Sequence, residues 1–523
     1  MLLGPSRAVD PTGHDGTCRP PNGQNVGVDD RIEQLEATLT DPALADRVEM
    51  VVRPTGPDTY RAAAVDGAVT FRRRAEDGRY AYDVLEVAGR DPLADQSTDH
   101  LLGHDAERSH AQPARTANAY PHAFDSVAQF FDAPHAPDLV ITHTAAHMTD
   151  GHLGQHGSLG TVQARAPFIA AGAGVASLGT VERSTRVVDV APTIAALLQL
   201  DPHPRGRGPT GEPRTDALLA RQDGDPISDV LDGHRAEHVV VHLLDGCNAN
   251  LLHDAIDAGE APHIAGLVAR GTDFRHGAYA SLPTATLANH TTAVTGAHPG
   301  HSGVLHNTWL DRSDGSVPDL LAFDQMFWAM RHLSPEVETL FQAVARSRPG
   351  AFSSASFEFC DTGATWSSFA DVRDGVGGDL PPLEEVTHLD PAAAERSEAY
   401  RFMSRVDHLS VLHTLDAWSG TGGAPLPTLS WCGLAVTDEA GHESGPHGEL
   451  ARAAVRDSDA RVGEVLAAVE RAGALERTAV VVIADHGMEQ ADPSIDRDWA
   501  SDLAATGIGC RDIGGGLVYL DRS

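Results

Sequence analysis

Three strongly apolar runs in the second half of the chain are each followed or closed by an aspartate. The runs cover residues 237–244, 428–436 and 477–484, and the acids are Asp245, Asp438 and Asp485. Continuous apolar runs of this length are typical of central strands in a parallel sheet. Because ligands gather at the carboxyl ends of such strands, the pattern predicts an α/β sheet with a carboxylate cluster at one edge.

The patterns of apolar and polar residues in the remaining segments predict further helices, strands and irregular regions. Helices are predicted at 262–270, 286–295 and 449–472, and their alternation with the strands implies a sheet covered on both faces. In the first half we expect helices at 30–40 and 188–200, and strands at 48–52, 80–87, 138–142 and 166–171. Residues 1–28 are predicted to be a disordered leader, 201–236 a linker, and 313–425 a cap or substrate-facing insertion.

The chain is strongly acidic. It has 74 acidic and 39 basic residues, none of them lysine, and a formal net charge of −35. A field of that sign repels nucleic acid and anionic membrane, so we expect neither as a partner. A small anionic substrate would need a local positive centre, for which a bound divalent metal is the obvious candidate. Acidity that serves only solubility explains the charge equally well.

Cysteine usage and hydropathy bear on location. The five cysteines are scattered, odd in number and without a CxxC pair, which favours free thiols in a reducing compartment. The N-terminus lacks the charged and apolar regions of a secretory signal. No run of about 18 apolar residues occurs, so we expect no membrane span and a cytoplasmic protein.

Two of the three acids have a histidine in step with them. Asp438 is followed by His442 one helical turn later, and Asp485 is followed directly by His486. Each acid alone is more simply explained as a helix cap or turn residue. The set favours a divalent metal site, because carboxylate oxygen and imidazole nitrogen together suit Zn²⁺ or a similar ion.

Thr286 is expected at the start of the helix 286–295. A hydroxyl there lies beside exposed N–H groups and the helix dipole, which also favour a bound phosphate. Ligation to a metal would make that hydroxyl a nucleophile. The same residues are equally consistent with Thr286 as a helix N-cap, and Thr284 competes as the nucleophile on local grounds.

Several blocks of the chain, in order, resemble the nucleotide pyrophosphatase/phosphodiesterase branch of the alkaline phosphatase superfamily. Two are Thr437-Asp-Glu-Ala-Gly-His442 and Ile483-Ala-Asp-His-Gly-Met488, and the others cover 244–248, 260–264, 282–290 and 296–307. The resemblance extends over most of 237–523. It implies an α/β fold with an alkaline phosphatase-like central, mostly parallel sheet, helices on both faces and a cap insertion.

The resemblance also implies roles for single residues. Thr286 aligns with the family's reactive threonine, and Asn307 with its donor to a phosphate oxygen. One metal would be held by Asp245, Thr286, Asp485 and His486, and the other by Asp438, His442 and a further histidine. The implied activity is hydrolysis of phosphodiester or nucleotide pyrophosphate bonds in a small phosphate ester, through a phospho-threonine intermediate. Two divalent ions are implied, with Zn²⁺ the family-like choice.

The further histidine is missing from its usual place, because no histidine follows Met488. Blocks at 137–142, 155–158, 165–174 and 188–194 resemble the closing part of an alkaline phosphatase-type domain. We therefore predict a circular permutation, in which 29–200 completes the catalytic domain of 237–523 and 201–236 bridges the family's old ends. His156 would complete the second metal site, and its rivals in the same loop are His143, His147 and His152.

The sequence leaves other functions open. Phosphonate or phosphomonoester hydrolysis ranks next, followed by a phosphoglycerate mutase-like phosphotransferase and a non-catalytic metal-binding protein. A sulfatase is disfavoured, because the stretch from Thr286 lacks the Cys/Ser-x-Pro-x-Arg pattern. Trp309, Phe327 and Trp328 are candidate base-stacking residues, although such aromatics more often lie in the core.

Overall fold

The fold is built around an eight-stranded sheet. The computed structural model describes residues 28–145, 151–495 and 499–522. The strand order is β15 (Trp366–Ser367), β14 (Ser353–Ser356), β16 (Leu429–Leu434), β11 (His238–Leu244), β17 (Thr478–Ile483), β8 (Phe168–Gly172), β12 (Gly271–Phe274) and β9 (Gly179–Val181). Only β8 runs against its neighbours β17 and β12, so the sheet is mostly parallel as predicted.

The three apolar runs form adjacent central strands. β11 lies between β16 and β17, and its Val241 pairs with Trp431 on one side and with Val481 on the other. The strands are almost wholly buried, which explains their continuous apolar character. The run at 428–436 ends earlier than expected, because helix α15 (Val436–Ser444) begins at Val436 and takes Asp438 into its first turn.

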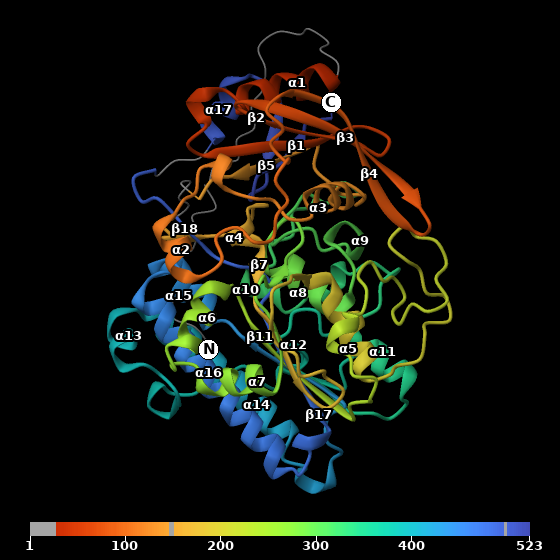
Figure 1. Ribbon diagram of the computed structural model, residues 1–523, viewed down its shortest axis with the longest axis vertical. Coiled ribbons are helices and arrows are strands. Elements are labelled where there is room, and N and C mark those ends of the chain that lie inside the picture. The colour runs from red at the N-terminus through yellow and green to blue at the C-terminus, as the bar shows by residue number, and fades with distance from the viewer. Residues whose placement is uncertain (1–27, 146–150, 496–498, 523) are drawn as a thin grey trace.

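Helices cover both faces of this sheet (Figure 1). One set is α6 (Ala249–Asp257), α7 (Pro262–Arg270), α14 (Glu398–Ala417) and α16 (Glu449–Arg471), and the other is α5 (Val190–Leu197), α8 (Thr286–Thr295) and α11 (Leu340–Ser347). The helices predicted at 262–270 and 286–295 match α7 and α8 in full. The insertion at 313–425 contains α14 and also supplies β14 and β15, so part of it belongs to the central sheet.

A second, seven-stranded sheet was not predicted. Its order is β19 (Cys510–Asp512), β20 (Leu517–Leu520), β5 (Leu139–His143), β1 (Val48–Gly56), β2 (Thr59–Ala64), β3 (Gly67–Glu76) and β4 (Arg79–Gly89). Every neighbouring pair in it is antiparallel. The strands predicted at 48–52, 80–87 and 138–142 belong to it, whereas the sequence pattern does not predict β2 and β3.

The two ends of the described chain meet at this second sheet. Strand β20, near the C-terminus, pairs with β5 from the first half. Helix α1 (Val28–Leu39) packs against α17 (Ala500–Ala505), and the Arg31 guanidinium donates a hydrogen bond of 3.2 Å to the carbonyl of Asp521. The predicted leader 1–28 lies, apart from Val28, outside the described residues.

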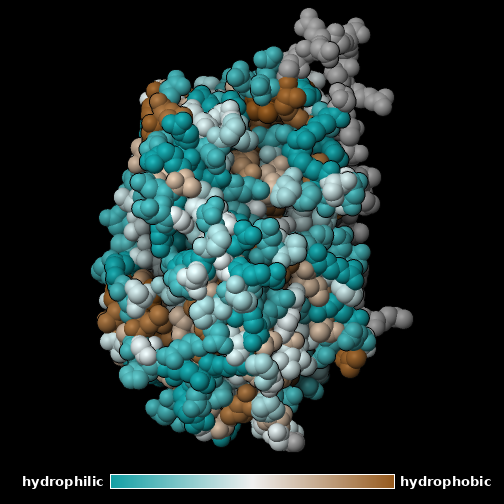
Figure 2. All heavy atoms as spheres, turned by 90° about the vertical axis from the view of Figure 1, so that its right-hand side faces the viewer, coloured by the Kyte–Doolittle hydropathy of each residue, from teal (hydrophilic) through white to brown (hydrophobic). Residues whose placement is uncertain are grey.

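The face of the molecule shown in Figure 2 is largely hydrophilic. On the face shown in Figure 2, hydrophobic residues form separate small patches among hydrophilic ones. Within the described ranges, no helix is both long enough and apolar enough to cross a membrane.

Candidate metal and phosphate site

The three aspartates meet at the carboxyl ends of the central strands. Asp245 directly follows β11, Asp485 lies just past β17, and Asp438 stands in the first turn of α15, the helix after β16. The neighbouring parallel strands end at the same edge of the sheet, which brings the three acids together. The backbone N–H of Gly246 donates a 3.0 Å hydrogen bond to Asp485 Oδ1, joining the turn after β11 to the one after β17.

A first group of possible ligands is buried. His486 Nε2 lies 3.1 Å from Asp485 Oδ2 and 3.8 Å from Asp245 Oδ1. The Thr286 hydroxyl lies 3.4 Å from the same nitrogen. The side chains of Asp485 and His486 are both 0% exposed. Asp245, Asp485 and His486 thus present their ligand atoms to one small volume, with Thr286 Oγ1 at its border.

A second group is formed across the two halves of the chain. His156 Nε2 lies 3.1 Å from His442 Nε2 and 3.7 Å from Asp438 Oδ1, and His442 Nε2 lies 3.5 Å from Asp438 Oδ2. The ring of His156 also stacks on His486, with centroids 3.8 Å apart, so the two groups adjoin. Asp438 and His442 keep 19% and 18% of their side chains exposed, and this group therefore faces solvent.

The chemistry of these residues fits divalent cations. Asp245 Oδ1, Asp438 Oδ1 and Asp485 Oδ2 are buried and have no hydrogen-bond partner within the described part of the chain. Such buried acceptors are costly unless something pairs with them. Carboxylate oxygens and imidazole nitrogens in this number are the donor set of a zinc-type site.

The charge state of the ligands points the same way. Burial, and next the carboxylates of Asp485 and Asp438, raise the pKa of Asp245 above its usual range. Burial also raises the pKa of Asp485 to about 6. Burial, and then the His486 and His442 rings, lower the pKa of His156. Without a cation, burial and mutual repulsion therefore disfavour the ionised form of these carboxylates. A bound cation would favour that ionised form.

The two candidate threonines have different surroundings. Thr286 is the first residue of α8 and Ala285 is the N-cap, so the Thr286 hydroxyl does not cap the helix. The Thr284 hydroxyl instead accepts a hydrogen bond from the N–H of Gly157 and donates one to the carbonyl of Ser158. Thr284 is wholly buried, and its hydroxyl is hydrogen-bonded to backbone groups. The Thr286 hydroxyl instead faces the His486 ring.

Asn307 stands beside the start of α8. Its Oδ1 accepts a 3.0 Å hydrogen bond from the N–H of Leu287, the residue after Thr286. This contact holds the amide at the first turn of α8, the helix that begins at Thr286.

Of the loop histidines, the structure brings His156 to the ligand cluster. Its Nδ1 is held 2.7 Å from the Thr284 carbonyl, which directs Nε2 toward His442. His143 lies behind it, with Nε2 3.1 Å from the His156 carbonyl, and His152 packs its ring on His442. His147 lies outside the described residues.

Two residues near the site were not predicted. His290 Nδ1 lies 3.0 Å from Glu358 Oε2, and its Nε2 lies 3.8 Å from Asp245 Oδ2. His290 stands on α8, four residues after Thr286, which is a signal that the sequence carried. Glu358 follows β14 within the insertion, and no motif marked it.

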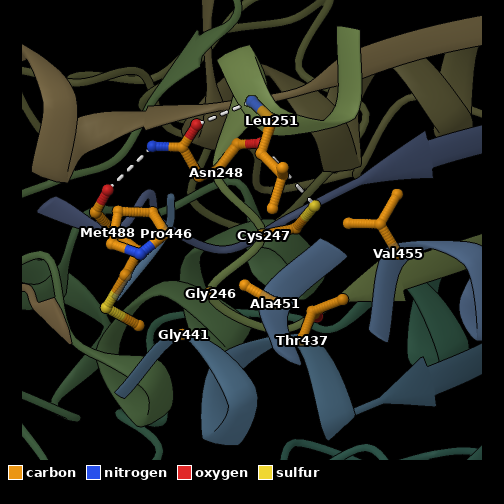
Figure 3. A pocket seen from close by; sticks show the side chains of 10 residues that line it. All are labelled: Gly246, Cys247, Asn248, Leu251, Thr437, Gly441, Pro446, Ala451, Val455 and Met488. Atoms are coloured by element: carbon orange, nitrogen blue, oxygen red, sulfur yellow. Dashed lines mark hydrogen bonds between the residues drawn. The ribbon is translucent and has the colours of Figure 1, made fainter. Parts of the chain in front are cut away.

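Hydrogen bonds of Asn248 stabilise the turn after β11. Figure 3 shows Asn248 accepting a hydrogen bond from the N–H of Leu251 and donating one to the carbonyl of Met488. A cavity of about 10 Å³, lined by Gly246, Thr437, Gly441 and Met488 among others, lies beside these contacts. It has room for about one water molecule, so this region supports the site rather than binding a substrate.

The candidate stacking aromatics make contacts of their own. Trp309 is 1% exposed and belongs to a hydrophobic core cluster. Trp328 carries the guanidinium of Arg331 on its ring at 3.5 Å, and Phe327 packs edge-on against Phe369. None of these described contacts joins them to the candidate metal ligands.

Comparisons with known proteins agree with the motifs. The model of the type I phosphodiesterase / nucleotide pyrophosphatase family matches residues 239–513, more than half of the chain. That range contains Thr286, Asn307 and the predicted ligands except His156. No curated protein matches the chain.

Solved structures of ectonucleotide pyrophosphatase / phosphodiesterase 5 are also similar to the chain. The murine protein is 20% identical, with 48% of this chain and 58% of that chain covered and a TM-score of 0.33. The human protein is 16% identical, with 48% and 57% covered and a TM-score of 0.32. An inactive variant of the murine protein in complex with AMP is 19% identical, with 49% and 58% covered and a TM-score of 0.31. The chain thus spans less than two thirds of these relatives.

The matched range includes the blocks that carry the strand-end aspartates and Thr286. The chain belongs to the type I phosphodiesterase / nucleotide pyrophosphatase family, a family of phosphodiesterase-type hydrolases.

Proposed function

We propose that the protein hydrolyses phosphodiester or nucleotide pyrophosphate bonds of small substrates, with Thr286 as nucleophile and two divalent cations, Zn²⁺ by preference. The observation that carries the proposal is the cluster of buried, unpartnered carboxylate oxygens beside the Thr286 hydroxyl. Asp245, Asp485, His486 and Thr286 would hold one cation, and Asp438, His442 and His156 the other. When bound, the cations supply Lewis-acid stabilisation of the attacking and leaving oxygens.

The residues of the chain position both reactants. Thr286 Oγ1 gives up its proton to solvent and attacks phosphorus from the first residue of α8, whose dipole favours the phosphate. With its Oδ1 bound to Leu287, Asn307 has Nδ2 to donate to a non-bridging oxygen. The bond to the leaving oxygen breaks, that oxygen takes up a proton, and the phosphoryl group becomes an ester of Thr286. Water then attacks phosphorus and loses a proton, and Thr286 Oγ1 leaves and takes up a proton.

Charge favours the diester over the monoester. None of the site's hydrogen bonds or ion pairs described above involves an arginine, and the chain has no lysine. A diester carries one negative charge at neutral pH, whereas a monoester carries about two, because its second phosphate pKa is about 6. The extra charge would have to be balanced by the cations alone.

We further propose that the chain is a circular permutation of the family order. The family model begins at residue 239, whereas His156 and the blocks around it lie upstream. The contact of Arg31 with Asp521 supports the proposal, because it leaves the two ends close enough to be joined. Residues 201–236 would then bridge the ends that the family leaves separate.

The assay compares bis(p-nitrophenyl) phosphate with p-nitrophenyl phosphate, with and without a chelator. We expect faster turnover of the diester, loss with the chelator, and recovery on adding Zn²⁺. Thr286→Ala should lower kcat by about 1000-fold or more, as loss of a nucleophile does elsewhere. Thr284→Ser serves as the matched control and should keep turnover per folded molecule. Absence of chelator-sensitive turnover of both esters would contradict the proposal, and transfer to an added sugar acid would indicate a phosphotransferase.

A further inference from the structure

Asp245 offers its two carboxylate oxygens to different histidines. Oδ1 lies 3.8 Å from His486 Nε2 in the first ligand group and has no hydrogen-bond partner within the described part of the chain. Oδ2 lies 3.8 Å from Nε2 of His290, a residue that is not a member of that group. One oxygen is therefore available to a cation, while the other is approached by a ring nitrogen that is itself buried and without a hydrogen bond.

The His290 ring is fixed from its far side. Nδ1 lies 3.0 Å from Glu358 Oε2, and the other carboxylate oxygen, Oε1, accepts the N–H of Cys360 at 2.9 Å. The His290 side chain is 2% exposed and that of Glu358 is 0%. The edge of the Phe359 ring packs against the imidazole, with centroids 5.1 Å apart. The carboxylate, the aromatic ring and the helix together leave the imidazole one orientation, with Nε2 toward Asp245.

A contribution to the stability of the fold does not by itself explain why His290 and Glu358 are buried as a pair. Removing a carboxylate and an imidazole from water costs several kcal/mol per charged group, and buried ion pairs often do no better than apolar side chains. By contrast, groups that hydrogen-bond the ligands of a metal fix their orientation, and losing such a group costs about 10–100-fold in metal affinity or activity. The unused nitrogen of His290 is aimed at a predicted ligand.

We propose that His290, held by Glu358, is a positioning residue that orients Asp245 for the cation of the first group. The inference rests on the proposed metal site. His290 acts through Asp245 and touches neither the substrate nor the cation. The Asp245 oxygen that faces His290 is kept from swinging into the ligand position, so the other oxygen occupies it.

Two substitutions of His290 separate this role from packing. In His290→Asn the amide takes the place of Nδ1, so it keeps Glu358 but falls short of Asp245. In His290→Gln the amide nitrogen takes the position of Nε2, so a donor continues to face Asp245. Both are introduced into the His156→Ala variant, in which only the first group should bind, and Zn²⁺ affinity is titrated against a chromophoric chelator.

We expect His290→Asn to weaken Zn²⁺ binding by about tenfold or more, and His290→Gln by less than about threefold. Asp273→Asn is the matched control, because it breaks another buried histidine–carboxylate pair, that of Asp273 with His253 at 3.0 Å. It should lower the urea midpoint without changing the Zn²⁺ affinity. Equal affinity of the Asn and Gln variants would overturn the inference. Absence of Zn²⁺ binding even with His156 and His290 intact would instead contradict the proposed metal site.

Discussion

His156 Nε2 lies 3.1 Å from His442 Nε2, although 286 residues separate the two in sequence. The first histidine comes from a loop that leads toward β8, and the second from α15, after the central strand β16. The second ligand group is thus complete only when the two halves of the chain come together. The first group, by contrast, is drawn entirely from the second half.

His156→Ala tests this dependence. We expect bound metal to fall from two ions per chain to one, and kcat/KM to fall by about 100-fold or more, beyond the usual effect of a supporting residue. The measurement is metal content by mass spectrometry beside diester turnover. His234→Ala is the control, since its side chain is 86% exposed. Full metal content in the His156→Ala variant would show that another residue completes the site.

Gly246 makes room for Asp438. A Cβ atom on Gly246 would lie 2.2 Å from Asp438 Oδ1, and the residue has a φ of 59°. We expect Gly246→Ala to displace Asp438 and to remove the second metal while the first is retained.

Gly259→Ala provides the matched control for backbone strain. Gly259 also has a positive φ, of 74°, but a Cβ there meets no atom within 4 Å. Both variants should lose stability to strain, by about 1 kcal/mol, as measured by urea unfolding. Only Gly246→Ala should change metal content, and a change in both would refute the steric explanation.

Glu489 should make stability depend on pH. Burial, and next the carboxylates of Glu49 and Glu107, raise its pKa from 4.5 to about 8, against a hydrogen bond from Gln163. The folded protein holds a proton that the unfolded chain releases near pH 4.5. This stabilisation is therefore full below that pH and is lost as pH rises through about 8.

Comparison with Glu489→Gln isolates the effect. The variant and the native chain should unfold alike at about pH 5, whereas the variant should be more stable at about pH 9 by a few kcal/mol. Urea unfolding at both pH values measures the difference. Glu470→Gln, at an exposed position of α16, should show no such divergence. Parallel pH profiles for Glu489→Gln and the native chain would rule out a buried proton there.

A relinked chain tests the proposed permutation. The C-terminus is joined to Val28 by a short Gly/Ser linker, and the chain is opened at the exposed turn of Gly233 and His234. Because Arg31 already contacts Asp521, we expect metal content and kcat/KM within about threefold of the native chain. Opening at Ala293, inside the buried helix α8, should abolish folding. A relinked chain that folds but binds one metal would contradict the proposal.

The central sheet could be predicted because its signal is local. Continuous apolar runs marked β11, β16 and β17, and their ends placed the three aspartates. The second sheet could not be predicted, because β3 carries three successive arginines, Arg72 to Arg74, which interrupt the alternation of apolar and polar residues expected of a strand. Its strands are stabilised by pairing with distant segments, and no short window contains that information.

The candidate site was predictable to a different depth for each residue. The spacing of Asp438 and His442 predicts them as a pair of ligands. His156 is predicted only because no histidine follows Met488, where the family order places one. The local sequence could not exclude Thr286 as the N-cap, because a helix that began one residue later would have made Thr286 the N-cap. Glu358 had no signal at all, because its significance lies in a contact with His290 across 68 residues.

The steric course at phosphorus tests the central claim most directly. A single-isomer phosphorothioate diester is hydrolysed in ¹⁸O-enriched water, and the configuration of the product is determined. Attack by Thr286 followed by attack by water inverts phosphorus twice, so the account predicts net retention. Net inversion would mean that water attacks the substrate directly, and it would contradict a phospho-threonine intermediate at Thr286.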